Sequence, residues 1–270
     1  MGLFSFGKKK KKQTENQEAS GFIGFVLLSE PSWDREQFVK DLKKDWDIDA
    51  APAIDDEEDE KYRDILVLEL DGMRLAVSFM DMPVPNGEAE TYAAANYMWP
   101  DAVETTKKHK AQILVAVLGE DAGPFERGKL FTKAVSSCLN QEHAVAVYTD
   151  GAVFQPEFYR DFSMMMKDGT LPVMNWVWFG IHRDKKQAGI YTYGMKKFGR
   201  DEIEVYTDTE QADFNEIHSF MLDIVTYILE SDVTLNDGET IGFTEDQKLP
   251  ITRSKGIALD GQTLKIGYGN

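Results

Sequence analysis

The stretch from residue 171 to residue 229 constrains the fold more than any other part of this chain. Two apolar segments, 173–181 and 188–193, have the length and the aromatic and β-branched content of strands. The polar residues 184–186 between them predict a hairpin, and a compact glycine turn and a short strand at 203–206 follow. A sheet of such strands, backed by the helix that comes next, indicates a mixed α+β domain.

That next helix has the strongest pattern in the sequence. Asp208 is predicted as its N-cap, with Gln211 three residues later in the position of a capping box. Apolar residues then recur at helical spacing and define a buried face. The residues on this face are Phe214, Ile217, Met221, Ile224 and Ile228.

The order of elements before residue 120 is typical of a ferredoxin-like unit, βαββαβ with an antiparallel sheet. A helix capped by Asp34 follows the first strand, and Asp71-Gly72 joins the second and third strands. Pro100 is expected to kink the second helix. The predicted elements are strand 22–28, helix 35–47, strands 65–70 and 75–80, helix 88–108 and strand 112–118.

A helix within 121–142 is expected to connect this unit to a second one with the same order of elements. The second unit begins with a strand at 144–148 and a helix from Pro156, and it closes with a strand at 241–243. A hairpin around Asp260-Gly261 is expected to extend its sheet. The predicted fold is α+β, with tandem ferredoxin-like units joined by a connecting helix. The predicted parts are a disordered basic leader at 1–20, units at 21–120 and 143–270, and the connecting helix at 121–142.

Composition excludes several function classes. The net charge of −17 argues against nucleic acid as a partner and suits either a soluble protein or one with a basic protein partner. The single cysteine, Cys138, excludes an intramolecular disulfide and thiolate metal sites, and it fits the reducing cytoplasm. No apolar run of about 18 residues is present, so no stable membrane insertion is expected. The lysines at 8–12 leave weak contact with an anionic membrane as an alternative.

The sequence contains no motif that assigns catalytic residues, a metal site or a cofactor. His109 follows two lysines at a predicted helix end, where a structural role is expected. Pro83 and Pro85 force an extended turn before this helix. If a pocket exists between the two units, Glu88, Trp99 and His109 are the residues expected to line it.

The second hairpin carries an unusual number of aromatic residues. Trp176 and Trp178 on one strand, and Tyr191 and Tyr193 on the other, fall at alternating positions and predict an aromatic ladder. The first unit, a dimer partner or a ligand is expected to cover this face. Downstream, Glu202 and Glu204 share one face of a strand, where they either bind a basic partner or face solvent.

Two stretches, 80–115 and 191–205, carry a family likeness. The first contains Met-Asp-Met-Pro-Val-Pro, Tyr-Met-Trp-Pro-Asp-Ala and His-Lys-Ala-Gln-Ile-Leu-Val. The second is Tyr-Thr-Tyr-Gly-Met-Lys-Lys-Phe-Gly-Arg-Asp-Glu-Ile-Glu-Val. Together they resemble the bacterial domain-of-unknown-function family 4261, over most of the chain from residue 21 to about residue 243.

The second stretch also resembles a Gly…Phe-Gly…Glu-x-Glu motif of small bacterial domains, some linked to toxin immunity. The matching residues are Gly194, Phe198, Gly199, Glu202 and Glu204. The family supplies no catalytic residues, and it implies a bacterial cytoplasmic protein. The sequence therefore predicts a soluble protein-binding module, with toxin neutralisation as one form of it and a homodimer left open. The alternative is an enzyme or small-ligand-binding protein that uses a groove between the two halves.

Overall fold

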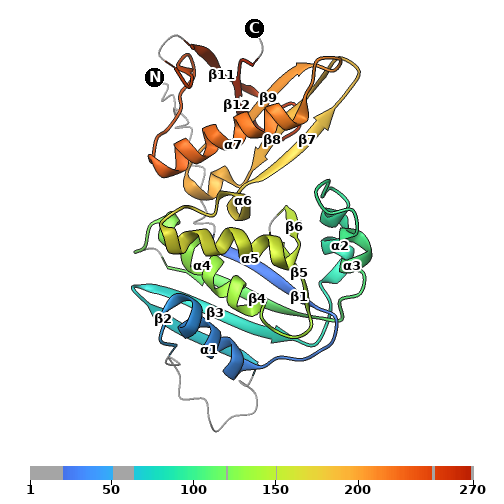
Figure 1. Cartoon of the computed structure of the whole chain (residues 1–270), viewed down its shortest axis with the longest axis vertical. Helices are drawn as coiled ribbons and strands as arrows, with labels where there is room; N and C mark the ends of the chain where they lie inside the picture. The colour runs from blue at the N-terminus through green and yellow to red at the C-terminus, as the bar shows by residue number, and fades with distance from the viewer. Residues whose placement is uncertain (1–20, 51–63, 120, 150, 245–246, 269–270) are drawn as a thin grey trace, which may run out of the picture.

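The computed structural model describes residues 21–50, 64–119, 121–149, 151–244 and 247–268. The predicted leader at 1–20 and an acidic run at 55–60, predicted to be a loop, lie outside the described residues. The chain forms two α+β halves that lie one above the other along the long axis of the molecule (Figure 1). Each half is built around one six-stranded sheet.

The first sheet has the strand order β2-β3-β4-β1-β5-β6, and every neighbouring pair is antiparallel. β1 lies in its interior because it is apolar along its whole length. The strands are β1 (Phe22–Leu28), β2 (Ile65–Leu70), β3 (Met73–Met80), β4 (Ala111–Leu118), β5 (Ala144–Thr149) and β6 (Ala152–Phe154).

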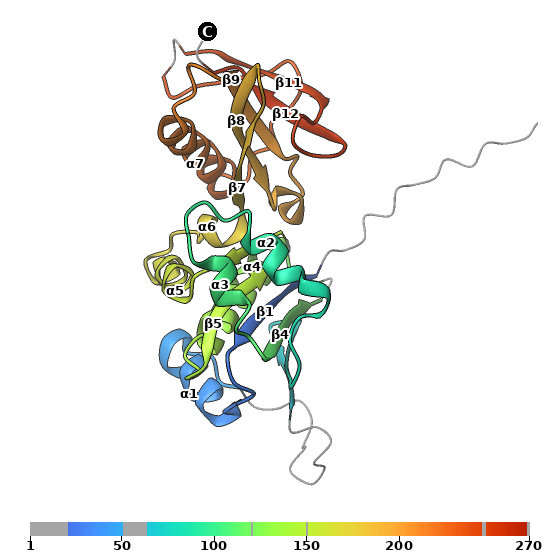
Figure 2. The ribbon, with the colours of Figure 1, turned by 90° about the vertical axis from the view of Figure 1, so that its right-hand side faces the viewer.

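Helices cover the two faces of this sheet unequally. On one face, α1 (Arg35–Trp46), α4 (Pro124–Cys138) and α5 (Pro156–Met164) bury the main core. Asp34 caps α1 by accepting the Gln37 backbone N–H at 2.8 Å, as its sequence predicts. On the other face, the short helices α2 (Glu88–Ala93) and α3 (Ala102–Thr106) cover only the side of β5 and β6 (Figure 2).

The second sheet has the order β10-β11-β12-β9-β8-β7, and α7 (Phe214–Glu230) covers one face of it. Pairing is antiparallel except between β12 and β9, which are parallel. The predicted C-terminal hairpin is β11 and β12. The strands are β7 (Trp178–Arg183), β8 (Gln187–Tyr193), β9 (Ile203–Asp208), β10 (Thr240–Ile241), β11 (Leu249–Lys255) and β12 (Gln262–Ile266).

The α+β class is confirmed, but the tandem ferredoxin-like arrangement is not. In a ferredoxin-like unit the first strand lies between the third and the fourth, whereas here β3 pairs with β4 and β1 lies between β4 and β5. β5 and β6, predicted to open the second unit at residue 143, are strands of the first sheet. α4, predicted as a connector, packs on β4 and β1. The order of elements along a chain does not fix these pairings, because long-range packing decides them.

Two local predictions also need correction. The helix predicted over 88–108 is divided into α2 and α3 by a turn, in which the Asn96 side chain accepts the backbone N–H groups of Met98 and Trp99. The N-cap of α7 is Asp213, whose carboxylate accepts two backbone N–H groups, while Asp208 is the last residue of β9. In both places a short polar side chain accepts backbone N–H groups nearby: Asn96 in the turn between α2 and α3, and Asp213 at the start of α7.

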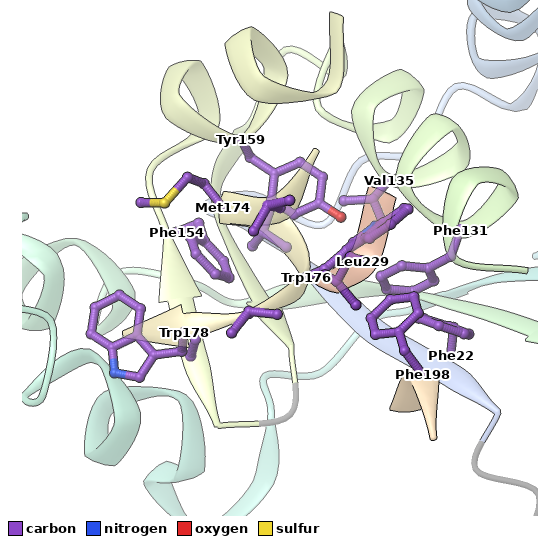
Figure 3. Packing of buried hydrophobic residues seen from close by; sticks show 14 of the residues in the cluster. Phe22, Phe131, Val135, Phe154, Tyr159, Met174, Trp176, Trp178, Phe198 and Leu229 are labelled. Atoms are coloured by element: carbon purple, nitrogen blue, oxygen red, sulfur yellow. The ribbon is translucent and has the colours of Figure 1, made fainter. Parts of the chain in front are cut away.

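An aromatic cluster joins the two halves (Figure 3). Phe198, in the 3-10 turn η4 (Met195–Phe198), packs on Trp176 with ring centroids 4.8 Å apart and on Phe22 of β1 at 5.6 Å. The Trp176 indole Nε1 donates to Thr132 Oγ1 of α4 at 2.8 Å. One continuous core of buried hydrophobic residues therefore includes side chains from both sheets.

Phe198→Ala should destabilise the protein by about 3 to 5 kcal/mol, because it leaves a cavity in the cluster that joins the halves. Tyr227→Ala, at a position on α7 that is 51% exposed, is the control and should change stability by less than about 0.5 kcal/mol. Urea unfolding monitored by circular dichroism measures both. Equal stability of the two variants would show that Phe198 does not hold the halves together.

Candidate functional site

A groove of about 800 Å³ lies between the two halves, beside the aromatic cluster. Its first wall comes from β1, β5 and the start of α2. Its second wall comes from the end of β8, the turn η4, Glu202 just before β9 and the loop between β11 and β12. The residues that line it are Gly21, Ile23, Phe25, Glu88, Tyr148, Tyr193, Gly194, Lys196, Lys197, Glu202, Ala258, Leu259 and Asp260.

The first wall is an apolar floor with one polar pair. The rings of Phe25 and Tyr148 lie on neighbouring strands and stack with centroids 5.7 Å apart. Ile23 precedes them on β1 and points away from the main core. The Tyr148 hydroxyl donates to Glu88 Oε1 at 2.6 Å, so an acidic group stands at the edge of the floor. An apolar body and a hydrogen-bonding group can both be accommodated here.

The second wall carries two lysines on a turn held by a buried carboxylate. Glu202 accepts hydrogen bonds from Thr192 Oγ1 at 2.8 Å, from the Gly194 backbone N–H at 3.0 Å and from the Lys196 backbone N–H at 3.3 Å. Burial raises the pKa of Glu202 against the opposing effect of these hydrogen bonds. The turn thus fixed presents the side chains of Lys196 and Lys197 to the groove.

Glu204, two residues later, holds the other part of this wall. Its carboxylate accepts the backbone N–H groups of Ile257 and Ala258 at 3.0 Å, and Lys265 Nζ lies 2.8 Å from it. Burial acts to raise the pKa of Glu204, but Lys265 and the two backbone donors outweigh it and lower the pKa. The loop bonded to Glu204 continues into Leu259 and Asp260, which line the groove.

Position 194 requires a glycine for two reasons, its backbone conformation and the atoms packed against it. Its φ is +125°, a conformation that residues with a side chain rarely adopt. A Cβ atom there would lie 2.3 Å from the Trp176 carbonyl oxygen. Gly199 ends the same turn at φ +70° with open space around it. The Gly…Phe-Gly…Glu-x-Glu motif is therefore a positioning device for the second wall.

Of the three residues expected to line a pocket between the halves, only Glu88 does so. His109 is buried away from the groove, where its Nε2 accepts the Val84 backbone N–H at 2.9 Å and its Nδ1 contacts the Thr106 carbonyl. The ring thus holds the turn that contains Pro83 and Pro85. Trp99 packs against the small core beneath α2 and α3.

The predicted aromatic ladder is partly wrong. Trp176 belongs to the short helix α6 (Val173–Trp176), because Asn175 donates to the Tyr159 carbonyl and to Ser163 Oγ and so holds this segment in a turn. Trp178 pairs with Tyr193 across β7 and β8, and Tyr191 lies opposite Gly180. The first half covers Trp178, whose ring is 5.5 Å from that of Tyr97. Tyr193 also lines the groove.

Glu202 and Glu204 are both buried. The expectation that they face a basic partner or solvent is therefore corrected. Sequence reasoning did not select the floor residues Ile23 and Phe25 or the lysines at 196 and 197. The only local signal for the two lysines is their place inside the glycine turn. The sequence of β1 contains no signal for Ile23 and Phe25 as site residues, because its apolar run predicts burial on both faces.

The described part of the chain contains no cluster of three or more His, Cys, Asp or Glu side chains placed to hold a metal ion. Among the same residues, no helix is long and apolar enough to cross a membrane.

Gly194→Ala should cost at least about 2 kcal/mol of stability, because it combines backbone strain with a clash against the Trp176 carbonyl. Gly199→Asn is the matched control and should cost less than about 1 kcal/mol, since Asn tolerates the left-handed conformation and the site is open. Chemical denaturation of both variants gives the comparison. If Gly194→Ala left the free energy of unfolding unchanged, the close packing of position 194 against the Trp176 carbonyl oxygen would be contradicted.

Glutamine substitutions at 202 and 204 should respond to pH in opposite directions. The pKa of Glu202 is raised on folding, so its stabilising contribution is present at low pH and is lost as pH rises through the folded pKa. Glu202→Gln should therefore gain stability relative to the wild type as pH rises from 4 towards neutral. The pKa of Glu204 is lowered, so its contribution is present above the ordinary value and is lost as pH falls.

Glu204→Gln should accordingly be most destabilising near neutral pH, and its deficit should shrink in acid. Unfolding free energies of the wild type and both variants, measured between pH 3 and 7, provide the check. Parallel pH profiles for the two variants would contradict the assignment.

Comparison with known proteins adds one finding. Residues 191–267 match the model of a domain of unknown function, DUF4261, while no curated protein and no solved structure matches the chain. The likeness was expected from residue 21 to about residue 243. The match instead covers the second quoted stretch and the C-terminal hairpin, and leaves the first stretch outside. The segment that builds the second wall of the groove, with its two lysines and its two buried glutamates, thus matches the DUF4261 family.

Proposed function

We propose that this protein is a binding module whose ligand occupies the groove between the two halves. The observation that supports this most is the groove itself. Its volume of about 800 Å³ lies within the range of small-molecule sites. Two buried carboxylates hold its second wall in place. A site of this kind binds without reorganising its backbone, which lowers the entropic cost of association.

The lining residues define the chemistry of the ligand. Ile23, Phe25 and the Tyr148 ring offer an apolar floor on which a ring or branched chain can lie. Across the groove, the ammonium group of Lys196 attracts a negative charge, while Lys197 Nζ lies 5.8 Å from the centroid of the Phe22 ring. A small molecule fits both walls when its apolar body lies on the floor and its carboxylate or similar acidic group is placed at Lys196, away from Glu88 and Asp260.

The sequence-based hypothesis of a protein partner, including an immunity-type role, stays a prediction. The residues expected to form its contact surface do not favour it. Trp176 and Trp178 are covered by the first half, and the carboxylates of Glu202 and Glu204 are buried and hydrogen-bonded. The groove supports the alternative hypothesis, a ligand site between the halves, more directly.

A thermal-shift screen with paired compounds tests the proposal. Each pair consists of an aromatic or branched carboxylic acid and its neutral amide. We expect the acids to raise the melting temperature more than the amides, and titration calorimetry then measures the affinity of the best acid. Lys196→Glu should weaken that affinity about tenfold or more, since a favourable charge becomes a repulsive one.

The matched control is Lys185→Glu, which makes the same charge change on the exposed turn between β7 and β8. It should leave the affinity within about twofold of the wild type, because Lys185 lies outside the groove. If both lysine variants weakened binding equally, the loss would come from the change in net charge and not from a contact of Lys196 with the ligand. Absence of binding by any compound would remove the proposed function.

A further inference from the structure

The groove between the halves carries charged side chains of both signs. Glu88 lies on its first wall, and Lys196 and Asp260 lie on its second wall. All three side chains are exposed. Within the part of the chain that the structure describes, none of them forms a salt bridge. The groove therefore offers a ligand one cation and two carboxylates that this chain does not pair with each other.

Glu88 is held in place although it is exposed. Its Oε1 accepts the hydroxyl group of Tyr148, a residue 60 positions away in sequence and only 5% exposed. The Tyr148 ring stacks with Phe25 at 5.7 Å and with Tyr92 at 5.6 Å between ring centroids, so the hydroxyl itself is fixed. An exposed glutamate ordinarily keeps its rotamer freedom. Here the carboxylate is already positioned at the edge of the groove floor, which lowers the cost of binding a cation.

An ammonium group has the chemistry that this edge of the groove accepts. Among the described residues, Glu88 Oε2 accepts no hydrogen bond, so it can take an N–H donor while Oε1 keeps its bond to Tyr148. The aromatic rings of Phe25 and Tyr148 line the groove beside this carboxylate. A cation is attracted by the face of such rings as well as by the negative charge.

We propose that the ligand of the groove is an apolar zwitterion, either a free amino acid or a short peptide. Its ammonium group pairs with Glu88, its carboxylate pairs with Lys196, and its apolar side chain lies on Ile23 and Phe25. This inference rests on the proposed function, which by itself requires only the acidic group. A simple anion meets two unpaired carboxylates and the field of a chain with a net charge of −17, whereas a zwitterion carries no net charge.

Titration calorimetry of the full chain with four forms of phenylalanine and of leucine tests the proposal. The forms are the free amino acid, its N-acetyl derivative, its amide and its N-acetyl amide. We expect the free amino acid to bind about tenfold or more tightly than the N-acetyl derivative, because acetylation removes the ammonium group and leaves the carboxylate. The dipeptide phenylalanyl-leucine, measured beside them, shows whether the groove prefers the charge spacing of a peptide or of a single amino acid.

Glu88→Gln separates the two ends of the ligand. Glutamine keeps an acceptor oxygen for the Tyr148 hydroxyl and removes only the charge. The variant should bind the free amino acid about tenfold more weakly and bind the N-acetyl derivative at least as well as the wild type does. Glu157→Gln is the matched control, because Glu157 is also an exposed glutamate in the first turn of a helix and lies outside the groove. It should change both affinities by less than about twofold. Circular dichroism checks that each variant is folded.

The outcomes keep this inference apart from the proposed function. N-acetyl derivatives that bind as tightly as the free amino acids, and more tightly than the N-acetyl amides, would overturn the zwitterion and leave the acid-binding groove intact. Equal losses of amino-acid affinity in Glu88→Gln and Glu157→Gln would also overturn it, because the effect would then come from net charge. Absence of binding by every form would remove the proposed function together with the inference.

Discussion

The hydrogen bonds that the buried Glu202 carboxylate accepts from the turn after β8 determine both the joint between the halves and the groove beside it. The bonds from Gly194 and Lys196 fix the backbone of η4. Once the turn is fixed, Phe198 packs into the aromatic cluster of the first half, while Lys196 and Lys197 before it line the groove and Lys197 Nζ lies over the Phe22 ring. One carboxylate therefore supports the packing of the halves and the shape of the candidate site.

A second buried glutamate nearby has the same role. Glu204 of β9 holds the loop between β11 and β12, as Glu202, the residue before β9, holds η4, so the two glutamates position two separate segments of the wall. A charge buried with such a complete set of donors is tolerable, whereas a missing partner would leave it uncompensated. The Glu-x-Glu pattern is explained by this positioning role, and the chain needs no external basic partner to satisfy it.

Local signals in the sequence predicted the local structure well. The range of β1, the capping of α1 by Asp34 and the hairpin at Asp71-Gly72 are confirmed, because each depends on residues close in the chain. Strand order was not predictable, because β5 joins the first sheet through contacts more than 100 residues away in sequence. Trp176 was placed on a strand because the hydrogen bonds from Asn175 that bend this segment have distant partners.

The candidate site was predicted only in part, because local patterns indicate some of its residues and long-range packing decides the others. Glu88, Tyr193, Gly194 and Glu202 were selected by motif and pattern, and all four line the groove. The floor was missed because Ile23 and Phe25 lie in an apolar run that predicts burial on both faces. Only the three-dimensional arrangement shows that the helices cover one face of β1 fully and the other only near β5.

Hydrogen exchange at the backbone amides of Gly194 and Lys196 tests most directly whether Glu202 organises this region. Both amides donate to the buried carboxylate, so they should exchange as slowly as the amides within β8, and Glu202→Ala should release them while the amides of β1 stay protected. Exchange of these two amides in the wild type at the rate of unprotected turn amides would contradict the central role of Glu202.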